Sequence, residues 1–446
     1  MIDTIIILIY FLILTSIGVL SAKKINTFKD YALSHTKYSY LVIIATLSAS
    51  FLGGGFTMGI SGKVYNVGLI AVIGMFGFSV KELVVAKVFA KHFSKFPNAI
   101  SIGDIMKEKY GKLSKIISGI LGTIVCAGIV GVQINALGYI WAEFFNINQT
   151  HAIIIATALL TFYTVLGGLT AIIISDIIQF WILIIGLPLL CIIGLIEVGG
   201  VTPLVQSLPA SHISFSMHDL WASLVLFLSI FFGETFVPPY IQRLMIGKET
   251  KDTEKGTFFS GILSIPIFII AGILGLIALT LYPSINSEAV IPTLLHNLLP
   301  IGLKGLLATG LLSAVMSTAD SFLQAGAVSF VHDSVKPLLK TNDDKRELLL
   351  FRLSTVTISL LALIAAIKVK GLIDLCMLAW TFWSPIMLVP FAAVLLGIQV
   401  SKKHFYIPAI SAAIVALISN SLLLGVLTSL LVFCLLKIRK ANDENR

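Results

Sequence analysis

The chain has 446 residues, of which 57% are hydrophobic and only 12% are charged, and its formal net charge is +9. A soluble domain carries roughly 25% charged residues, so this composition excludes an ordinary soluble protein. It predicts an all-α, polytopic integral membrane protein.

Apolar runs long enough to cross a bilayer recur along the whole chain. A helix needs roughly 20 residues to cross about 30 Å of hydrocarbon. The last two runs are short and share an uncharged hinge at Asn420, so twelve spans remain the alternative to thirteen. The thirteen predicted spans are 3–21, 40–63, 67–90, 116–144, 151–167, 170–198, 217–242, 256–282, 304–331, 349–367, 371–397, 405–419 and 421–437.

The distribution of basic residues supports the larger number. Lys and Arg collect in the cytoplasmic loops of membrane proteins. Most of the 31 basic residues follow spans 1, 3, 7, 9 and 11 or lie in the tail from Lys437. This pattern predicts an N-terminus outside and a C-terminus in the cytoplasm, which requires an odd number of spans. It also accounts for the net charge without a nucleic-acid partner, because the charge is spread over short loops.

The connections between spans are too short to hold a further domain. The longest, 91–115, 199–216, 283–303 and 332–348, run to roughly 15 to 25 residues. The eight histidines fall in loops or near span ends, and the four cysteines are isolated within apolar spans. We therefore expect no catalytic set, no transition metal, no organic cofactor and no obligate protein partner. Function is expected inside the membrane, at intramembrane polar groups and broken helices.

The stretch SAVMSTADS at 313–321 has the most informative spacing. On a helix Ala314, Ser317 and Thr318 stand at i, i+3 and i+4, so one face offers two hydroxyl oxygens beside a backbone carbonyl. Hard cations are bound by such oxygens. The alternative is that the hydroxyls bond back to the preceding turn, as they commonly do in membrane helices.

The stretch SASFLGGGFTMG at 48–59 places three consecutive glycines inside the second span. A helix interrupted there frees backbone groups, which is tolerated where they are buried in protein or bind an ion or solute. The carbonyls of Ala49 and Leu52 would then be available as ligands. A close-packed helix crossing through Gly55 and Gly59 is the alternative.

Four stretches together resemble the sodium:solute symporter family. They are SASFLGGGFTMGISGKVYNVG in the second span, FYTVLGGLTAIIISDIIQ at 162–179, PPYIQR at 238–243 and GLLSAVMSTADSFL at 310–323. The resemblance extends from about residue 2 to about residue 437, and the second span is similar to that of the choline-type branch. It implies a multi-pass protein of the bacterial cytoplasmic membrane.

The resemblance also implies a fold, an inverted repeat of five plus five helices as first described for a bacterial leucine transporter. We expect a single transporter domain over 1–446, with an extra N-terminal helix at 1–22, a first repeat at 39–199, an inverted repeat at 217–398 and two final helices at 403–438. Both repeats open on an interrupted helix, the second at Gly233 with Pro238 and Pro239.

The resemblance implies a role for individual residues of this sequence that match the family's site positions. The principal sodium site would use the carbonyls of Ala49, Leu52 and Ala314 and the hydroxyls of Ser317 and Thr318. Asp176 matches a family carboxylate implicated in a second sodium site or in coupling. Because the sequence shows no obvious basic partner for Asp176, a cation nearby and a purely structural role both remain open.

The implied function is sodium-coupled import of a small organic solute by alternating access. A sodium-independent exchanger or a channel of the same fold is the alternative. The aromatic Phe51 and the acidic Glu234 favour an organic cation, while an amino acid or another small metabolite remains open. Lys81 and Glu82 lie deep in the third span, where we expect Lys81 to snorkel, with pairing elsewhere or binding of a substrate carboxylate as the alternatives. Positions expected to face the solute are Ser50, Phe51, Gly53, Gly54, Phe78, Gln133, Glu234, Phe236 and Trp380, with Trp383 as a further candidate.

Overall fold

The computed structural model of the chain describes residues 2–22, 31–32, 36–166, 168–339, 344–369 and 371–444. In these ranges 86% of the residues are helical, and β-structure is confined to one isolated bridge between Tyr38 and Gly247. The prediction of an all-α protein is confirmed for this part of the chain.

The helices of the first half of the chain cover the first to sixth predicted spans. They are α1 (Ile2–Ala22), α3 (Tyr40–Phe51), α4 (Gly54–Val67), α5 (Ile70–Val84), α6 (Ile102–Tyr110), α7 (Lys112–Phe145), α8 (Gln149–Leu166), α9 (Leu169–Val198), α10 (Val201–Ser207) and α11 (Ala210–Ile213), with a π-helix η1 (Val85–Phe89) and a 3₁₀-helix η2 (Ala90–Lys95) after α5.

The helices of the second half of the chain cover the remaining predicted spans. They are α12 (Met217–Gly233), α13 (Pro238–Leu244), α14 (Thr250–Leu281), α15 (Val290–Leu298), α16 (Leu303–Val328), α17 (Lys336–Leu339), α18 (Asp344–Lys368), α19 (Leu372–Thr381), α20 (Ser384–Leu395), α21 (Lys403–Ser419) and α22 (Leu422–Glu444), with η3 (Ser287–Ala289) before α15 and η4 (Ser329–Val335) after α16.

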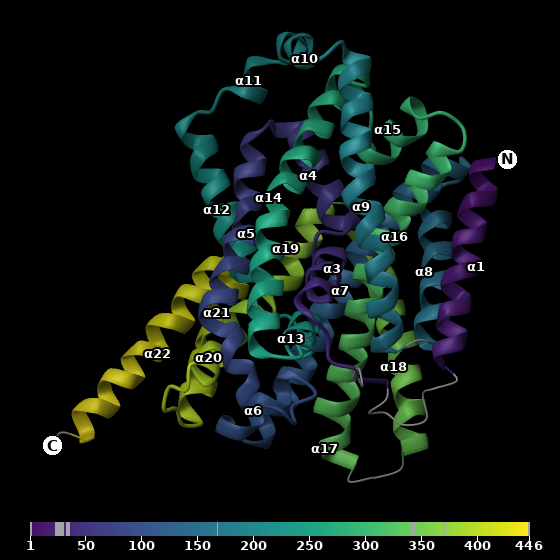
Figure 1. The fold of residues 1–446 in the computed structure, drawn as a ribbon. Coiled ribbons are helices and arrows are strands. Elements are labelled where there is room, and N and C mark those ends of the chain that lie inside the picture. Colours follow the sequence, from purple (N-terminus) through teal and green to yellow (C-terminus); the bar gives the residue numbers. More distant parts are fainter. Residues whose placement is uncertain are drawn as a thin grey trace.

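Each of the thirteen predicted ranges coincides with one helix or one broken pair of helices. By length and hydropathy the described helices include 5 that can cross a membrane, or up to 8 if each bent pair is one span. The number of thirteen crossings, and the division into two repeats, therefore stay predictions. Figure 1 places the N-terminus at the end of the bundle that carries α10 and α15 and the C-terminus at the opposite end, as an odd number of crossings requires.

Three helices are broken near the middle of the bundle. The axis bends by 51° between α3 and α4, by 63° between α12 and α13, and by 59° between α19 and α20. The first two breaks are those predicted from the glycines and from Pro238 and Pro239. The third break was not predicted, although α20 begins with Ser384 and Pro385, and proline is favoured in the first turn of a helix.

Local sequence explains the break between α12 and α13. Proline cannot donate the backbone hydrogen bond that a continuing helix needs, but it fits the first turn, where Pro238 and Pro239 begin α13. Phe236, between the two helices, has a φ of 62°. A bulky residue rarely adopts that conformation, so the surrounding packing must hold it there.

α16 is buried along almost its whole length. It contacts α3, α4, α7, α9 and α13. In Figure 1 α3, α7 and α13 lie in the middle of the bundle, whereas α1 and α22 lie at its edges. Polar groups on α16 consequently meet the ends of α3 and α13 away from lipid.

We predict that Asp3 fixes α1 to the start of α16. Its Oδ1 accepts the amide N–H groups of Gly302 (2.8 Å) and Gly305 (2.7 Å), donors that the first helical turn leaves unpaired. Asp3→Ala should lower stability by about 1–2 kcal/mol, the usual cost of removing a helix cap. Thermal unfolding in detergent measures this, with Glu197→Ala at an exposed position as the control; an equal effect of the two substitutions would contradict the assignment.

Candidate functional site

Oxygen atoms converge on the break between α3 and α4. Gly53 stands between the two helices, and a Cβ added to it would lie 2.3 Å from Thr318 Oγ1, 2.5 Å from the carbonyl oxygen of Ala314 and 3.1 Å from that of Ala49. Three of the five oxygens expected to bind sodium are thus brought together by segments about 265 residues apart in the sequence. Only glycine leaves the space between them open.

The other two expected ligands lie beside this point. Leu52 ends α3, and its amide N–H donates to the carbonyl of Ser48 at 2.8 Å. Ser317 is fully buried and donates its hydroxyl to Asp176 Oδ1. Thr318 donates to the carbonyl of Ala314 at 3.2 Å, which is the back-bonding expected under the alternative. Each donating hydroxyl keeps lone pairs, so back-bonding and cation binding are compatible.

Gln133 on α7 replaces a hydrogen bond that the break removes. In a continuous helix the amide of Gly55 would donate to the carbonyl of Phe51, but here it donates to Gln133 Oε1 at 3.1 Å. A Cβ on Gly55 would lie 2.5 Å from Gln133 Nε2. Gln133, predicted as a solute contact, is therefore seen holding the first turn of α4. Gly54, also predicted as a contact, begins that helix.

Asp176 has a basic partner that the sequence analysis did not find. Arg243 on α13 places its Nη2 3.2 Å from Asp176 Oδ2, and both side chains are fully buried. The argument for a nearby cation from an unpaired carboxylate was therefore wrong. Arg243 ends the stretch PPYIQR, and only the fold brings its side chain to Asp176 on α9.

The Asp176–Arg243 pair is the centre of a larger network. Asp176 also accepts from the hydroxyls of Thr46 and, at 3.3 Å, of Ser50 on α3. Arg243 donates to Thr46 at 3.1 Å and to Ser321 on α16. Ser50, predicted as a solute contact, lies within this network. A single carboxylate thus links α3, α9, α13 and α16.

Lys81 does not snorkel. Its ammonium is fully buried, 2.7 Å from Glu82 Oε1 and 3.2 Å from Glu234 Oε2. It also lies over the rings of Phe78 at 4.1 Å and Tyr240 at 4.3 Å. The snorkelling expectation was wrong, because Glu234 at the end of α12 supplies a partner in the membrane interior.

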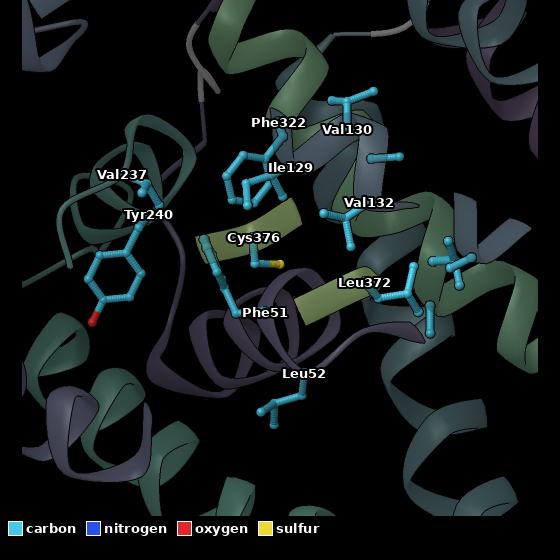
Figure 2. Close-up of a cluster of buried hydrophobic side chains, with 14 of the residues drawn as sticks. Phe51, Leu52, Ile129, Val130, Val132, Val237, Tyr240, Phe322, Leu372 and Cys376 are labelled. Atoms are coloured by element: carbon cyan, nitrogen blue, oxygen red, sulfur yellow. The ribbon is translucent and has the colours of Figure 1, made fainter. Parts of the chain in front are cut away.

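Aromatic rings fill the space between these charges. Phe51 meets Tyr240 edge-on at 5.4 Å and Phe322 at 5.7 Å between ring centroids. Figure 2 shows these three rings on separate elements near the break, with the Tyr240 hydroxyl turned away from the labelled hydrophobic side chains. Phe56 stacks on Trp380 at 6.0 Å. The rings belong to one tightly packed region.

Phe236 and the two tryptophans occupy different surroundings. Phe236 packs on Phe89 (5.0 Å) and Phe391 (5.1 Å) and is buried in the core. Trp380 and Trp383 are buried, and neither indole Nε1 has a hydrogen-bond partner among the described residues. A Cβ on Gly233 would lie 2.6 Å from the Trp380 ring, so the breaks in α12–α13 and α19–α20 meet here.

Cavities open at both ends of the bundle. The larger one, about 720 Å³, lies at the end where α13 and α14 meet η2 and is lined by Lys37, Phe93, Gln242 and Lys248 among others. A cavity of about 160 Å³ lies at the other end, between Lys63, Glu288 and Asp374. The sodium-ligand candidates lie between these two ends, buried from both.

A second charged cluster joins α6, α7 and η4. Asp104, His332 and Asp333 are close enough to bind a metal ion, but Lys115 Nζ lies 2.5 Å from Asp104 Oδ1 and 3.6 Å from Asp333 Oδ1. An ammonium in that position favours a salt-bridge cluster. Burial alone would raise the pKa of Asp104, but His332 and Lys115 hold it well below its ordinary value.

The comparison with known proteins now decides the family. The sequence model of the sodium:solute symporter family matches residues 31–415. The chain belongs to the sodium:solute symporter family. Members of the family are membrane transporters that carry a solute with sodium, and the chain is accordingly a transporter and not an enzyme.

Curated relatives of this symporter carry different solutes. The osmoregulated proline transporter OpuE of Bacillus subtilis is 24% identical over 83% of this chain and 79% of its own length. The sodium/pantothenate symporter of Haemophilus influenzae is 24% identical over 71% and 68%. The high-affinity choline transporter 1 of Caenorhabditis elegans is 24% identical over 75% of this chain, which spans only 61% of that protein.

Solved structures support the fold of the symporter. A Na+-coupled sialic acid symporter in a substrate-bound, outward-open state matches with a TM-score of 0.81 at 18% identity, over 97% of this chain and 96% of the other. The nucleobase-cation-symport-1 transporter Mhp1 matches with a TM-score of 0.58 at 13% identity, over 90% and 93%. The leucine-transporter-type fold expected from the sequence is shared with these proteins.

We predict that Asp176 and Arg243 stabilise the symporter as a pair. Removing one partner of a buried ion pair leaves an uncompensated charge and costs about 3–5 kcal/mol, whereas removing both costs much less. Arg243→Gln should therefore lower the unfolding temperature strongly, and adding Asp176→Asn should recover much of the loss. Thermal unfolding of the single and double variants tests the coupling; additive losses would contradict it.

We predict a pH dependence of stability that originates at Glu288 in η3. Burial and the nearby Asp374 raise the pKa of Glu288 to about 7, against the lowering effect of the Leu372 amide and Lys63. Because the folded state favours the protonated form, stability is full below the ordinary pKa of glutamate and falls as pH rises toward 7. Glu288→Gln should remove this loss in unfolding scans from pH 5 to pH 8, while Glu108→Gln at an exposed position should not.

Proposed function

We propose that this protein imports a small, carboxylate-bearing solute together with sodium by alternating access. The observation that carries the sodium part is the convergence of Ala49, Ala314 and Thr318 oxygens around Gly53. Ser317 and the carbonyl of Leu52 would complete the set. A hard cation without directional preference suits such a group of neutral oxygens.

The proposed coupling follows from where these oxygens originate. Sodium would bind across two segments, the break of α3–α4 and the middle of α16, and would hold them together. A bound ion then favours whichever conformation brings both segments into range. The membrane potential adds about 2.3 kcal/mol per charge for each 100 mV, so an inward-moving sodium ion can drive the uphill uptake of a solute.

The solute class rests on the hydrogen-bond donors near the breaks. The features that favoured an organic cation, Glu234 and the faces of Phe78 and Tyr240, are already engaged by the ammonium of Lys81. The indole N–H groups of Trp380 and Trp383 are buried donors without partners among the described residues. Buried N–H donors without partners suit a carboxylate, either in an amino-acid zwitterion or in a monocarboxylate.

We also propose the orientation of the protein in the membrane. The N-terminus lies outside, and the end of the bundle that carries α6 and α17 faces the cytoplasm. The 720 Å³ cavity then opens to the cytoplasm and the 160 Å³ cavity to the exterior. This assignment agrees with the distribution of basic loops. In this arrangement the larger cavity, beneath α13, would be the route of release.

We predict that Ser317→Ala with Thr318→Ala weakens sodium binding by roughly a hundredfold, about 1.4 kcal/mol or more for each lost ligand. Radioactive sodium binding to the purified protein measures the effect. Thr309→Ala is the matched control, because Thr309 lies on the same helix and bonds back to Gly305. Unchanged sodium affinity in the double variant would overturn the assignment of Ser317 and Thr318 to the sodium site, whereas absence of sodium binding to the unsubstituted protein would leave the sodium-independent exchanger or channel as the better account.

The solute class can be tested with matched ligands. Thermal shifts in NaCl and KCl should show stabilisation by carboxylates such as proline, only with sodium, and none by prolinamide or choline. Stabilisation by choline would instead restore the organic-cation hypothesis.

A further inference from the structure

The cluster of Glu82, Lys81 and Glu234 lies where α5 passes the break between α12 and α13. All three side chains are at least 98% buried. Lys81 Nζ is 2.7 Å from Glu82 and 3.2 Å from Glu234, so one ammonium serves two carboxyl groups. This cluster is separate from Asp176 and Arg243, which neutralise each other.

The charges of this cluster do not balance. Two ionised carboxylates and one ammonium leave one negative charge in the membrane interior, where an uncompensated charge costs several kcal/mol. One proton on either carboxyl group makes the cluster neutral. A sodium ion would need several additional oxygens around it, and the Lys81 ammonium already occupies the space between the two carboxyl groups.

The surroundings of Glu82 contain no further cation among the described residues. Tyr240 on α13 faces Glu82, and α14 presents the uncharged Gly261 and Ser264 to this part of α5. Near Glu234 the additional titratable group is Cys376 on α19. Among the described residues Lys81 is therefore the single basic group that faces either carboxyl group.

The unused hydrogen-bonding groups of this cluster point to a bound proton. Glu82 Oε1 contacts the Lys81 ammonium at 2.7 Å, but neither Glu82 Oε2 nor the hydroxyl of the fully buried Tyr240 has a hydrogen-bond partner among the described residues. An ionised carboxylate buried without hydrogen bonds is costly, whereas a protonated carboxyl group costs far less.

We propose that Glu82, Lys81 and Glu234 form a proton-binding site and that the proton held there is exchanged during the transport cycle. The proton is taken up by a carboxylate oxygen as an O–H bond and leaves to water when the cluster opens. The exchange step rests on the proposed function, because bending at the α12–α13 break would change the distance between Glu234 and Lys81. The proton site itself rests on the geometry alone.

Infrared spectroscopy of the purified protein tests the proton site. At neutral pH we expect a C=O stretching band from a buried, protonated carboxyl group. Glu82→Gln and Glu234→Gln should each abolish it, because the remaining carboxylate then pairs with Lys81. Lys81→Gln should strengthen it, since both carboxyl groups then need a proton. If both glutamine variants leave every such band unchanged, the proposal is overturned.

Asp320→Asn provides the reference for this assignment. Asp320 on α16 is buried and accepts a hydrogen bond from Thr164 on α8 at 2.9 Å. Its substitution should remove a different component and leave the band of the Glu82 cluster. Size-exclusion profiles of all four variants confirm folding, and if Glu82→Gln or Glu234→Gln does not fold, the other of these two variants makes the same prediction.

The pH dependence of radioactive sodium binding tests the exchange. Deprotonation adds a negative charge near the break, so sodium affinity should rise several-fold with pH in the wild type and stay flat in Glu82→Gln. Identical pH profiles would overturn the exchange step. Absence of sodium binding at every pH would overturn the sodium-coupled function and the exchange with it, while the infrared result still decides the proton site.

Discussion

The buried carboxylate of Asp176 is the point on which the centre of the structure depends. Its oxygens accept hydrogen bonds from Thr46 and Ser50 on α3, Ser317 on α16 and Arg243 on α13. A charge held without water must satisfy its lone pairs within the protein. The four helices are therefore fixed relative to one another by one group, and the oxygens around Gly53 lie beside it.

The broken helices are tolerated because other elements replace their lost hydrogen bonds. Gln133 on α7 accepts from Gly55 at the start of α4. Ser384 at the start of α20 donates to the carbonyls of Phe232 and, at 3.1 Å, of Gly233 at the end of α12. The breaks in α12 and α19 thus stabilise each other. Irregular backbone is kept away from lipid, and the polar groups released by each break become available to ions or solutes.

Much of this arrangement could be predicted from the sequence, because membrane spans and helix breaks are local signals. Each predicted range coincides with helix, and the glycines at 53–55 and the prolines at 238–239 mark two real breaks. Ser317 and Thr318 could be placed on one face by spacing alone. That they meet Gly53 was implied by the family resemblance and by no local pattern.

Long-range pairing of charges could not be predicted in the same way. Arg243 is 67 residues from Asp176, and Glu234 is 153 residues from Lys81. No periodicity relates such positions, so Asp176 was interpreted as unpaired and Lys81 as snorkelling. The consequence reaches the substrate, because the acidic and aromatic groups that favoured an organic cation are engaged by Lys81.

Hydrogen–deuterium exchange in NaCl and in KCl tests the central claim most directly. If sodium bridges the α3–α4 break and α16, sodium should slow exchange in the peptides that contain residues 48–57 and 313–319, and potassium should not. The break holds amides outside regular helix, so protection there reports binding and not general rigidity. Equal exchange in the two salts, or protection confined to segments far from Gly53, would contradict the sodium site.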